Sequence, residues 1–445
     1  MTALLEKQWL ESKEKAKNAM INADCWSKQQ QMGRRWAIGC VALEITQRCN
    51  LDCTLCYLSE HSEAVADIPI EEIYRRIDEI YTLYGPKTDI QVTGGDPTLR
   101  KRDELIDIIR YIKQKNMRST MMTNGIRASR SLLTDLAQAG LNDVAFHVDT
   151  TQNIKNATDE KSLNEKREKY INNTKGLGLS VMFNTTIHKD NFHEIPDLIN
   201  FFIKHAGSIR TVSFQSQADT GRGVAGKRDA VINQETVWNK IEEGLGTTLN
   251  HEAIRTGHKH CNRYGMSVIT NNKAYDLLAD SNLIGELQES TAHITLDRKY
   301  KLKTAAKLIR WYMTHPKYFF TIAAYLSGLL NKIKKDFILA KGKVHTLSFF
   351  THNFMDACEL DEERIDACVF KTMTKDGPVS MCAHNAKRDD YILQPIPIVK
   401  EQEIQFWHPL DAKLYKNNPE ILITNPKKYP QKKQKGKTRL SNCSN

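Results

Sequence analysis

The sequence predicts an α/β fold whose core is a sheet of parallel strands joined by helices. Extended apolar stretches alternate with helical patterns from residue 41 onward, and six such strand–helix units follow one another. This alternation is typical of parallel strands connected by crossover helices. With 445 residues, of which 40% are hydrophobic and 26% charged, the chain can form one large domain with additions or several domains.

The expected elements follow in chain order. Strands are expected near residues 41–46, 88–93, 117–123, 142–149, 180–187 and 209–216. Helices are expected over a polar, Lys- and Glu-rich segment at residues 3–20 and near residues 69–84, 101–115, 129–139, 160–176 and 191–205. In the fourth strand, Phe146 alternates with His147 and Asp149, and Gln215 lies with Gln217 on one face near the end of the sixth. Strands packed on both faces would be apolar throughout, so we expect these polar faces to line a cavity.

Three cysteines come directly after the first strand. Cys49, Cys53 and Cys56 have the spacing C-x3-C-x2-C, and three thiolates on one short loop can hold three corners of a cubane iron–sulfur cluster while the fourth iron stays open. A structural zinc site would need a fourth Cys or His nearby, for which His61 is the only candidate. Disulfides are disfavoured because ten cysteines in 445 residues are sparse and no signal peptide is recognisable.

A second motif, Gly94-Gly95-Asp96-Pro97-Thr98, ends the second strand. Paired glycines let a backbone approach a ligand closely. Together with the cysteine loop, this motif resembles the radical S-adenosylmethionine (radical SAM) superfamily over about residues 38–220, with Asp96 in the place of the usual Glu.

The resemblance implies a partial, TIM-like (β/α)6 barrel with its chemistry at the carboxyl ends of the strands. It implies that Cys49, Cys53 and Cys56 hold a [4Fe-4S] cluster, that SAM chelates the open iron, and that reductive cleavage of SAM yields a 5′-deoxyadenosyl radical that abstracts hydrogen. An electron donor such as flavodoxin or ferredoxin is implied, and no general acid or base is assigned. The residues expected to contact SAM are Tyr57, Gly94, Gly95, Asp96, Thr98, Asn124 and Gln215.

Four further cysteines, Cys261, Cys358, Cys368 and Cys382, occur in the second half of the chain. Four thiols can complete an auxiliary [4Fe-4S] cluster. The neighbouring histidines, at positions 258, 260, 352 and 384, leave zinc open, and buried structural thiols are the third possibility. The stretch from His352 to Asn385 is similar to the end of the radical SAM subgroup that includes archaeal tetraether lipid synthase and the pterin methylase-like proteins.

The net charge of +11 is concentrated between residues 298 and 343, which hold twelve Lys or Arg and one acid, Asp336. Within this segment, residues 318–330 are uncharged and mostly apolar. A basic helix with such a part suits a membrane surface, and a buried helix with basic flanks is the alternative. Nucleic acid is disfavoured because aromatic residues do not alternate with the charges, and the absence of a run of ~20 apolar residues disfavours a membrane span.

These features predict five regions and one leading function. The regions are an N-terminal helical segment (1–37), a core barrel (38–220), a helical region with the basic amphipathic segment (221–350), a cysteine-containing auxiliary region (351–398) and a polar basic tail (399–445). We expect a cytoplasmic radical SAM enzyme, peripheral at the inner face of the membrane, that acts on an apolar or amphiphilic small molecule such as a lipid by carbon–carbon bond formation or methylation. The alternatives are a peptide-modifying radical SAM maturase and a non-enzymatic iron–sulfur electron carrier or redox sensor.

One further pattern, G-x-G-x-x-G at residues 221–226, matches a dinucleotide-binding loop. It follows the sixth strand rather than the first, so we interpret it as a loop at the barrel rim, in which Arg222 can meet a carboxylate or phosphate.

Overall fold

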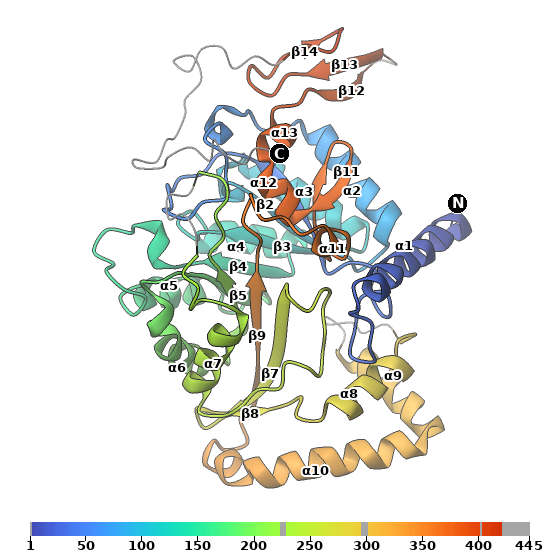
Figure 1. The fold of residues 1–445 in the computed structure, drawn as a ribbon, viewed down its shortest axis with the longest axis vertical. Coiled ribbons are helices and arrows are strands. Elements are labelled where there is room, and N and C mark those ends of the chain that lie inside the picture. The colour runs from blue at the N-terminus through green and yellow to red at the C-terminus, as the bar shows by residue number, and fades with distance from the viewer. Residues whose placement is uncertain (1, 223–227, 295–300, 401–402, 421–445) are drawn as a thin grey trace.

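An eleven-stranded sheet organises the described part of this computed structural model, residues 2–222, 228–294, 301–400 and 403–420 (Figure 1). The strand order is β11-β10-β1-β2-β3-β4-β5-β6-β9-β7-β8. The six strands from β1 to β6 run parallel in chain order: β1 (Cys40–Thr46), β2 (Asp89–Gly94), β3 (Arg118–Thr123), β4 (Asp143–His147), β5 (Ser180–Ile187) and β6 (Ile209–Ser216). The prediction of six βα units in a largely parallel sheet is confirmed.

Five amphipathic helices connect these strands and cover the sheet. They are α2 (Ile70–Tyr84), α3 (Arg102–Gln114), α4 (Arg130–Ala139), α5 (Asn164–Thr174) and α6 (Ile195–Lys204). In α2, Ile73, Ile77 and Ile80 recur at helical spacing and are fully buried, which places one apolar face against the sheet. Each such side chain stabilises the fold by about 1.5–3 kcal/mol relative to an exposed one.

Two further parallel strands extend the sheet beyond the six predicted ones. Strand β9 (His345–Asn353) pairs with β6, and β10 (Phe370–Thr374) pairs with β1. The two outer strands meet through aromatic side chains: the ring of Phe370 lies 6.2 Å from that of Phe350 and 5.3 Å from that of His352. Eight parallel strands therefore surround the barrel interior, and side chains rather than backbone hydrogen bonds bridge the last gap.

The region predicted to be helical, residues 221–350, also contains strands. The hairpin of β7 (Asn262–Thr270) and β8 (Lys273–Asp276) pairs with β9. The helices of this region are α7 (Gln234–Leu245), α8 (Ser281–Ser290), α9 (Lys301–Thr314) and α10 (Pro316–Leu339). Helix α10 lies along the lower edge of the molecule (Figure 1), and no helix in the described residues is both long and apolar enough to span a bilayer.

The two ends of the described chain pack differently. Helix α1 (Thr2–Asn22) packs on α2, where Trp9 Nε1 donates to the Tyr81 carbonyl at 2.9 Å. The C-terminal part adds α11 (Glu362–Asp366), β11 (Gly377–Ser380), α12 (Met381–Ala386), α13 (Arg388–Ile392), and a separate sheet of β12 (Ile396–Lys400), β13 (Glu403–Trp407) and β14 (Leu414–Tyr415). The segment expected to be a polar tail from residue 399 thus includes two strands, and its basic run at 426–439 lies outside the described residues.

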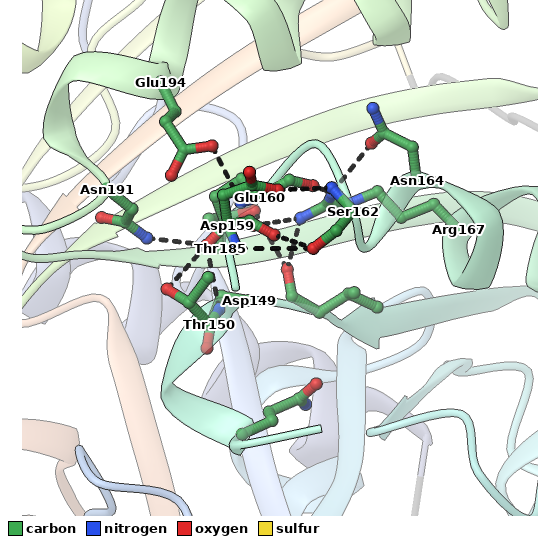
Figure 2. Close-up of polar contacts among 12 residues, drawn as sticks. Asp149, Thr150, Asp159, Glu160, Ser162, Asn164, Arg167, Thr185, Asn191 and Glu194 are labelled. Carbon is green, nitrogen blue, oxygen red and sulfur yellow. Dashed lines mark hydrogen bonds and ion pairs between the residues drawn. The ribbon is translucent and has the colours of Figure 1, made fainter. Parts of the chain in front are cut away.

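A buried ion pair holds the loop that follows β4 (Figure 2). The side chains of Glu160 and Arg167 are fully buried and 2.5 Å apart. Glu160 accepts hydrogen bonds from the Thr150 amide at 3.0 Å and from Asn191 at 2.8 Å, while Arg167 donates to the Val148 carbonyl at 2.9 Å. These bonds fix the segment that begins beside His147 and Asp149, at the carboxyl edge of the sheet.

Candidate active site

A cavity of about 880 Å³ occupies the barrel interior. At the carboxyl edge of the strands it is lined by the predicted residues Cys49, Cys53, Cys56, Tyr57, Gly94, Gly95, Asn124 and Gln215. It also reaches residues at the opposite edge, where β2, β3 and β4 begin with Asp89, Arg118 and Asp143. The predicted residues Asp96 and Thr98 do not line the cavity; both are buried behind it.

The glycine pair allows the cysteine loop to pack against the end of β2. Gly95 N donates to the Thr46 carbonyl at 2.9 Å, and Asp96 N donates to the Arg48 carbonyl at 2.8 Å. A Cβ atom would lie 1.9 Å from the Thr46 oxygen at Gly94 and 2.0 Å from the Arg48 oxygen at Gly95. From the sequence we expected the glycine pair to allow close approach of a ligand; in the structure it permits close approach of the loop that carries the cysteines.

Asp96 connects the ends of β2 and β3. Its carboxylate accepts hydrogen bonds from the Thr98 amide at 3.0 Å, from the Thr123 hydroxyl at 2.9 Å and from the Asn124 amide at 2.9 Å. Asn124 Nδ2 in turn donates to Asn50 Oδ1 at 2.6 Å and lies 4.0 Å from the Cys49 sulfur. The side chains of Asp96 and Thr98 therefore position Asn124 beside the cysteine loop.

Arg222 provides a buried cation next to the cysteines. Its guanidinium bonds to the Cys56 side chain and lies 3.6 Å from carboxylate oxygens of Asp52 and Glu63. Burial raises the pKa of Cys49 to about 11, and the charge of Arg222 opposes this shift. Burial likewise raises the pKa of Cys53 well above its ordinary value, and the charge of Arg222 again opposes the shift.

Three thiols on one short loop beside a buried cation fit an anionic iron–sulfur cluster. In the described part of the chain, no three His, Cys, Asp or Glu side chains surround a position for one metal ion. Each thiolate of a cubane binds a different iron, so its sulfurs lie farther apart than those around one zinc ion. The sequence pointed to Arg222 only as a rim residue, because its contact with the cysteine loop joins residues far apart in the chain.

The C-terminal helices cover the cysteine loop. Arg388, at the start of α13, lies 4.7 Å over the ring of Tyr57 and donates to Glu44 Oε1 at 2.7 Å. Burial alone would raise the pKa of Glu44. The charges of Arg388 and His384 have the larger effect and lower this pKa to about 2. Tyr57 donates its hydroxyl to the Gly94 carbonyl at 2.7 Å. Arg388 and the Gly94 carbonyl thus contact the predicted residue Tyr57 from two sides.

His147 and Asp149 form a polar pair at the end of β4. His147 Nε2 lies 2.7 Å from Asp149 Oδ2 and 3.2 Å from the Thr186 hydroxyl. Burial alone would lower the pKa of His147, but the charge and hydrogen bond of Asp149 raise it above its ordinary value. His147 also lines the cavity.

Three of the four cysteines of the second set lie near one another. Cys261 precedes β7, Cys368 precedes β10 and Cys382 lies in α12. Burial, and after it the charges of Cys368 and Cys261, raise the pKa of Cys382 to about 12. The pKa of Cys261 is raised by burial and by the charges of Cys368 and Cys25. Cys358 lies in the turn between β9 and α11.

A further cysteine, Cys25, lies beside this set. Cys25 is buried in an apolar cluster with Ala367 and Val369, the residues on either side of Cys368. Gln30 Nε2 donates to the carbonyls of Cys25 and Gly257 at 3.3 and 3.0 Å. Two of the histidines near the second set have other partners: His258 Nε2 lies 2.9 Å from Glu363 and His352 Nδ1 lies 2.8 Å from Asn262.

The cysteine loop lies at the carboxyl ends of the barrel strands and lines the cavity, which is the arrangement of an enzyme site. Residues 43–202 match the model of the radical SAM superfamily, so this part of the chain is a radical SAM domain. Enzymes of this superfamily use a [4Fe-4S] cluster and SAM, and Cys49, Cys53 and Cys56 are the residues that fit the cluster.

Three relatives illustrate the range of this superfamily. The chain is 22% identical over 420 residues to 7,8-dihydro-6-hydroxymethylpterin dimethyltransferase of Methanocaldococcus jannaschii, which covers 81% of this chain and 79% of that enzyme. It is 29% identical over 188 residues to Fe-coproporphyrin III synthase of Methanosarcina barkeri (41% of this chain, 45% of that one). It is 25% identical over 169 residues to PqqA peptide cyclase of Bradyrhizobium diazoefficiens (37% and 43%). The chain spans less than half the length of the last two.

Proposed function

We propose that this radical SAM enzyme acts on an apolar or amphiphilic small molecule such as a lipid, by methylation or carbon–carbon bond formation. The observation that carries the proposal is the cavity, which connects the cysteine loop to an apolar wall. Its volume of about 880 Å³ is at the upper end of the range for small-molecule sites. The wall includes Tyr264, Met266, Leu287, Leu308, Phe350 and Phe370. Similarity to the pterin dimethyltransferase over most of both chains supports methylation.

The chain's own residues bind and shield the reacting groups. Cys49, Cys53 and Cys56 hold the cluster, and Arg222 compensates its negative charge. When bound, the cluster and SAM supply a 5′-deoxyadenosyl radical that can abstract hydrogen from an unactivated carbon. The residues that face SAM are Tyr57, Gly94, Gly95, Asn124 and Gln215, with Asp96 and Thr98 positioning them from behind.

Two features of the site shield the reacting groups and orient the substrate. Helix α13 begins at Arg388, which is bonded to Glu44 and stacked on Tyr57. This helix shields one side of the cysteine loop from water and other quenchers. His147 lines the cavity and, held in place by Asp149, is positioned to contact the polar end of the substrate. The apolar wall then orients the rest of the molecule.

We also propose an auxiliary cluster bound by Cys25, Cys261, Cys368 and Cys382. The packing of Cys25 against the residues that flank Cys368, and the mutual charge interactions of the thiols, support this set in place of one with Cys358. The electron donor is a small carrier such as flavodoxin or ferredoxin, and the enzyme works in the cytoplasm at the membrane surface.

Peptide modification is the second candidate function. The similarity to PqqA peptide cyclase favours it, but that similarity covers only the part of the chain that the superfamily shares. A pure electron carrier is disfavoured because it would need no cavity of this size beside its cluster.

The test is anaerobic reconstitution followed by iron counting and a SAM cleavage assay with dithionite, with and without a total lipid extract. We expect about eight irons in the wild type and about four in the Cys49/Cys53/Cys56→Ala variant, which should form no 5′-deoxyadenosine. Lipid extract should raise 5′-deoxyadenosine formation severalfold, whereas a mixed peptide digest should not. Reconstituted wild-type protein without iron would overturn the enzyme assignment, and stimulation by peptide alone would favour the maturase.

A further inference from the structure

Helices α9 and α10 each present an apolar stripe to solvent. The exposed side chains of the stripes are Leu302, Ala306, Ile309 and Met313 on α9 and Phe319, Ala323, Leu326 and Leu330 on α10. Both sets follow the spacing i, i+4, i+7, i+11, which aligns them along one side of a helix. Leu302 is 87% exposed, Met313 79% and Phe319 53%. Monomeric proteins rarely leave such continuous apolar surface uncovered unless something binds there.

The opposite faces of the same helices hold them to the body of the protein. Trp311 is buried, and its ring stacks on that of His315 at 4.3 Å, at the bend between the two helices. Tyr325 donates its hydroxyl to the Leu277 carbonyl at 2.9 Å, and Ile333 is buried. Because the inner faces are attached, the stripes keep facing outward.

The charge around the stripes has one sign. Between residues 298 and 343 the only acid is Asp336, and it is bonded to Asn271 at 2.7 Å, to Tyr275 at 2.5 Å and to Lys273 at 3.1 Å. The basic side chains flanking the stripes are exposed: Lys303, Lys307, Arg310, Lys317, Lys332, Lys334 and Lys335. An apolar stripe flanked by cations complements a surface with anionic headgroups over acyl chains.

The inner face of α9 leads to the candidate active site. Leu308 and Tyr312 of α9, with Ile284 and Leu287 of α8, line the cavity that Cys49, Cys53 and Cys56 line at its other end. An apolar path therefore runs from beneath the exposed helices to the cysteine loop.

We propose that α9 and α10 dock the protein flat on an anionic lipid bilayer, and that a lipid acyl chain enters the cavity past Leu308 and Tyr312. The docking stands on the two helices alone, whereas the entry of an acyl chain rests on the proposed function. The helices lie on the bilayer and do not cross it.

Docking is tested by flotation of the full-length protein with vesicles of phosphatidylcholine alone or with 30% phosphatidylglycerol. We expect at least tenfold tighter binding to the anionic vesicles at low salt, reduced severalfold in 0.5 M salt. The stripe variant Ile309→Ser/Met313→Ser/Phe319→Ser/Leu326→Ser should lose at least tenfold in binding. The matched control is Leu4→Ser/Leu10→Ser on α1, where the side chains are 71% and 65% exposed; it should bind as the wild type does.

Several outcomes would overturn docking. These are no binding to anionic vesicles at low salt, equal binding by the stripe variant, a dimer by light scattering that the stripe variant abolishes, or binding to a duplex DNA oligomer in preference to vesicles. Circular dichroism and the unfolding midpoint of the stripe variant verify its fold, which exposed substitutions should leave intact.

Acyl-chain entry is tested with vesicles that contain phosphatidylglycerol with a photoactivatable acyl chain. Cross-links to Ile284, Leu287, Leu308 or Tyr312 support entry, whereas cross-links confined to the exposed stripes overturn it and leave docking intact. The Cys49/Cys53/Cys56→Ala variant should float like the wild type, since its defect is in the cluster. Vesicle binding without SAM cleavage in reconstituted wild type would therefore remove the proposed function alone, and SAM cleavage without vesicle binding would remove docking alone.

Discussion

Replacing Gly95 by Ala should displace the cysteine loop. The new Cβ would lie 2.0 Å from the Arg48 carbonyl oxygen and 2.8 Å from that of Gln47, and neither backbone atom can turn aside as a flexible side chain would. To increase the distance between the new Cβ and the Arg48 oxygen to about 3 Å, the loop must move by about 1 Å. That movement stretches the hydrogen bonds of Gly95 N to Thr46 and Asp96 N to Arg48, now 2.9 and 2.8 Å, beyond the usual limit. Two lost hydrogen bonds of about 1 kcal/mol each and overpacking of about 1–3 kcal/mol should lower the free energy of unfolding by about 3–5 kcal/mol.

The assay for Gly95→Ala combines urea unfolding with iron content after anaerobic reconstitution. We expect the variant to lose the irons of the three-cysteine site, because the thiols no longer face one cluster position. The control is Gly328→Ala in α10, where a Cβ meets nothing within 4 Å and φ is not positive; it should keep full iron and gain up to about 1 kcal/mol. Wild-type iron content with unchanged stability in Gly95→Ala would refute the packing account of the glycine pair.

Three further predictions concern buried charges. Arg222→Met should keep the cluster but shift its reduction potential negative by roughly 60 mV, equivalent to a tenfold change in the one-electron equilibrium; an unchanged potential in a redox titration would show that Arg222 does not act on the cluster. Arg167→Met should destabilise the fold by about 3–5 kcal/mol in urea, because Glu160 is left buried and unpaired, and Glu160→Gln/Arg167→Met should recover part of that loss; equal losses would contradict this. The raised pKa of His147 means that its stabilisation is complete below its ordinary value of 6.5 and is lost as pH rises through the folded value. The free energy of unfolding should thus fall with pH above 6.5 in the wild type and less steeply in His147→Asn, and parallel profiles would exclude the pairing with Asp149.

Local patterns predicted the six central strands, but the barrel they belong to depends on distant contacts. Strands β1 to β6 come from continuous alternation of apolar stretches and helices, and neighbours in the sheet are neighbours in the chain. Strand β9 pairs Asn353 with Ser216, and β10 pairs Phe370 with Cys40, across more than a hundred intervening residues. Periodicity within a short stretch of sequence cannot predict a pairing between such distant strands. The sequence therefore indicated six parallel strands, whereas the sheet has eight.

The same distinction applies to the site. Cys49, Cys53 and Cys56 form a local motif, so the sequence alone could single them out as candidate cluster ligands, and the structure places all three at the cavity. Arg388 contacts the cysteine loop from the C-terminal part of the chain, and Cys25 lies beside the second cysteine set from the N-terminal part. Both placements depend on the folded structure. Asp96 is an intermediate case: its position in a glycine loop was visible in the sequence, but its bonds to Thr123 and Asn124 depend on the pairing of β2 with β3.

The G-x-G-x-x-G pattern shows how a motif can be correct in its residues and misleading in its usual meaning. Gly221 has φ of +60°, and a Cβ there would lie 2.4 Å from the Tyr57 carbonyl carbon, so this position requires glycine for the same reason as Gly95. The Arg222 amide then donates to the Leu58 carbonyl at 2.8 Å, which brings its side chain beside the cysteines. Residues 223–227 lie outside the described part of the chain. The first half of the pattern thus serves the contact between the rim of β6 and the cysteine loop, and that contact supplies the buried cation that an anionic cluster needs.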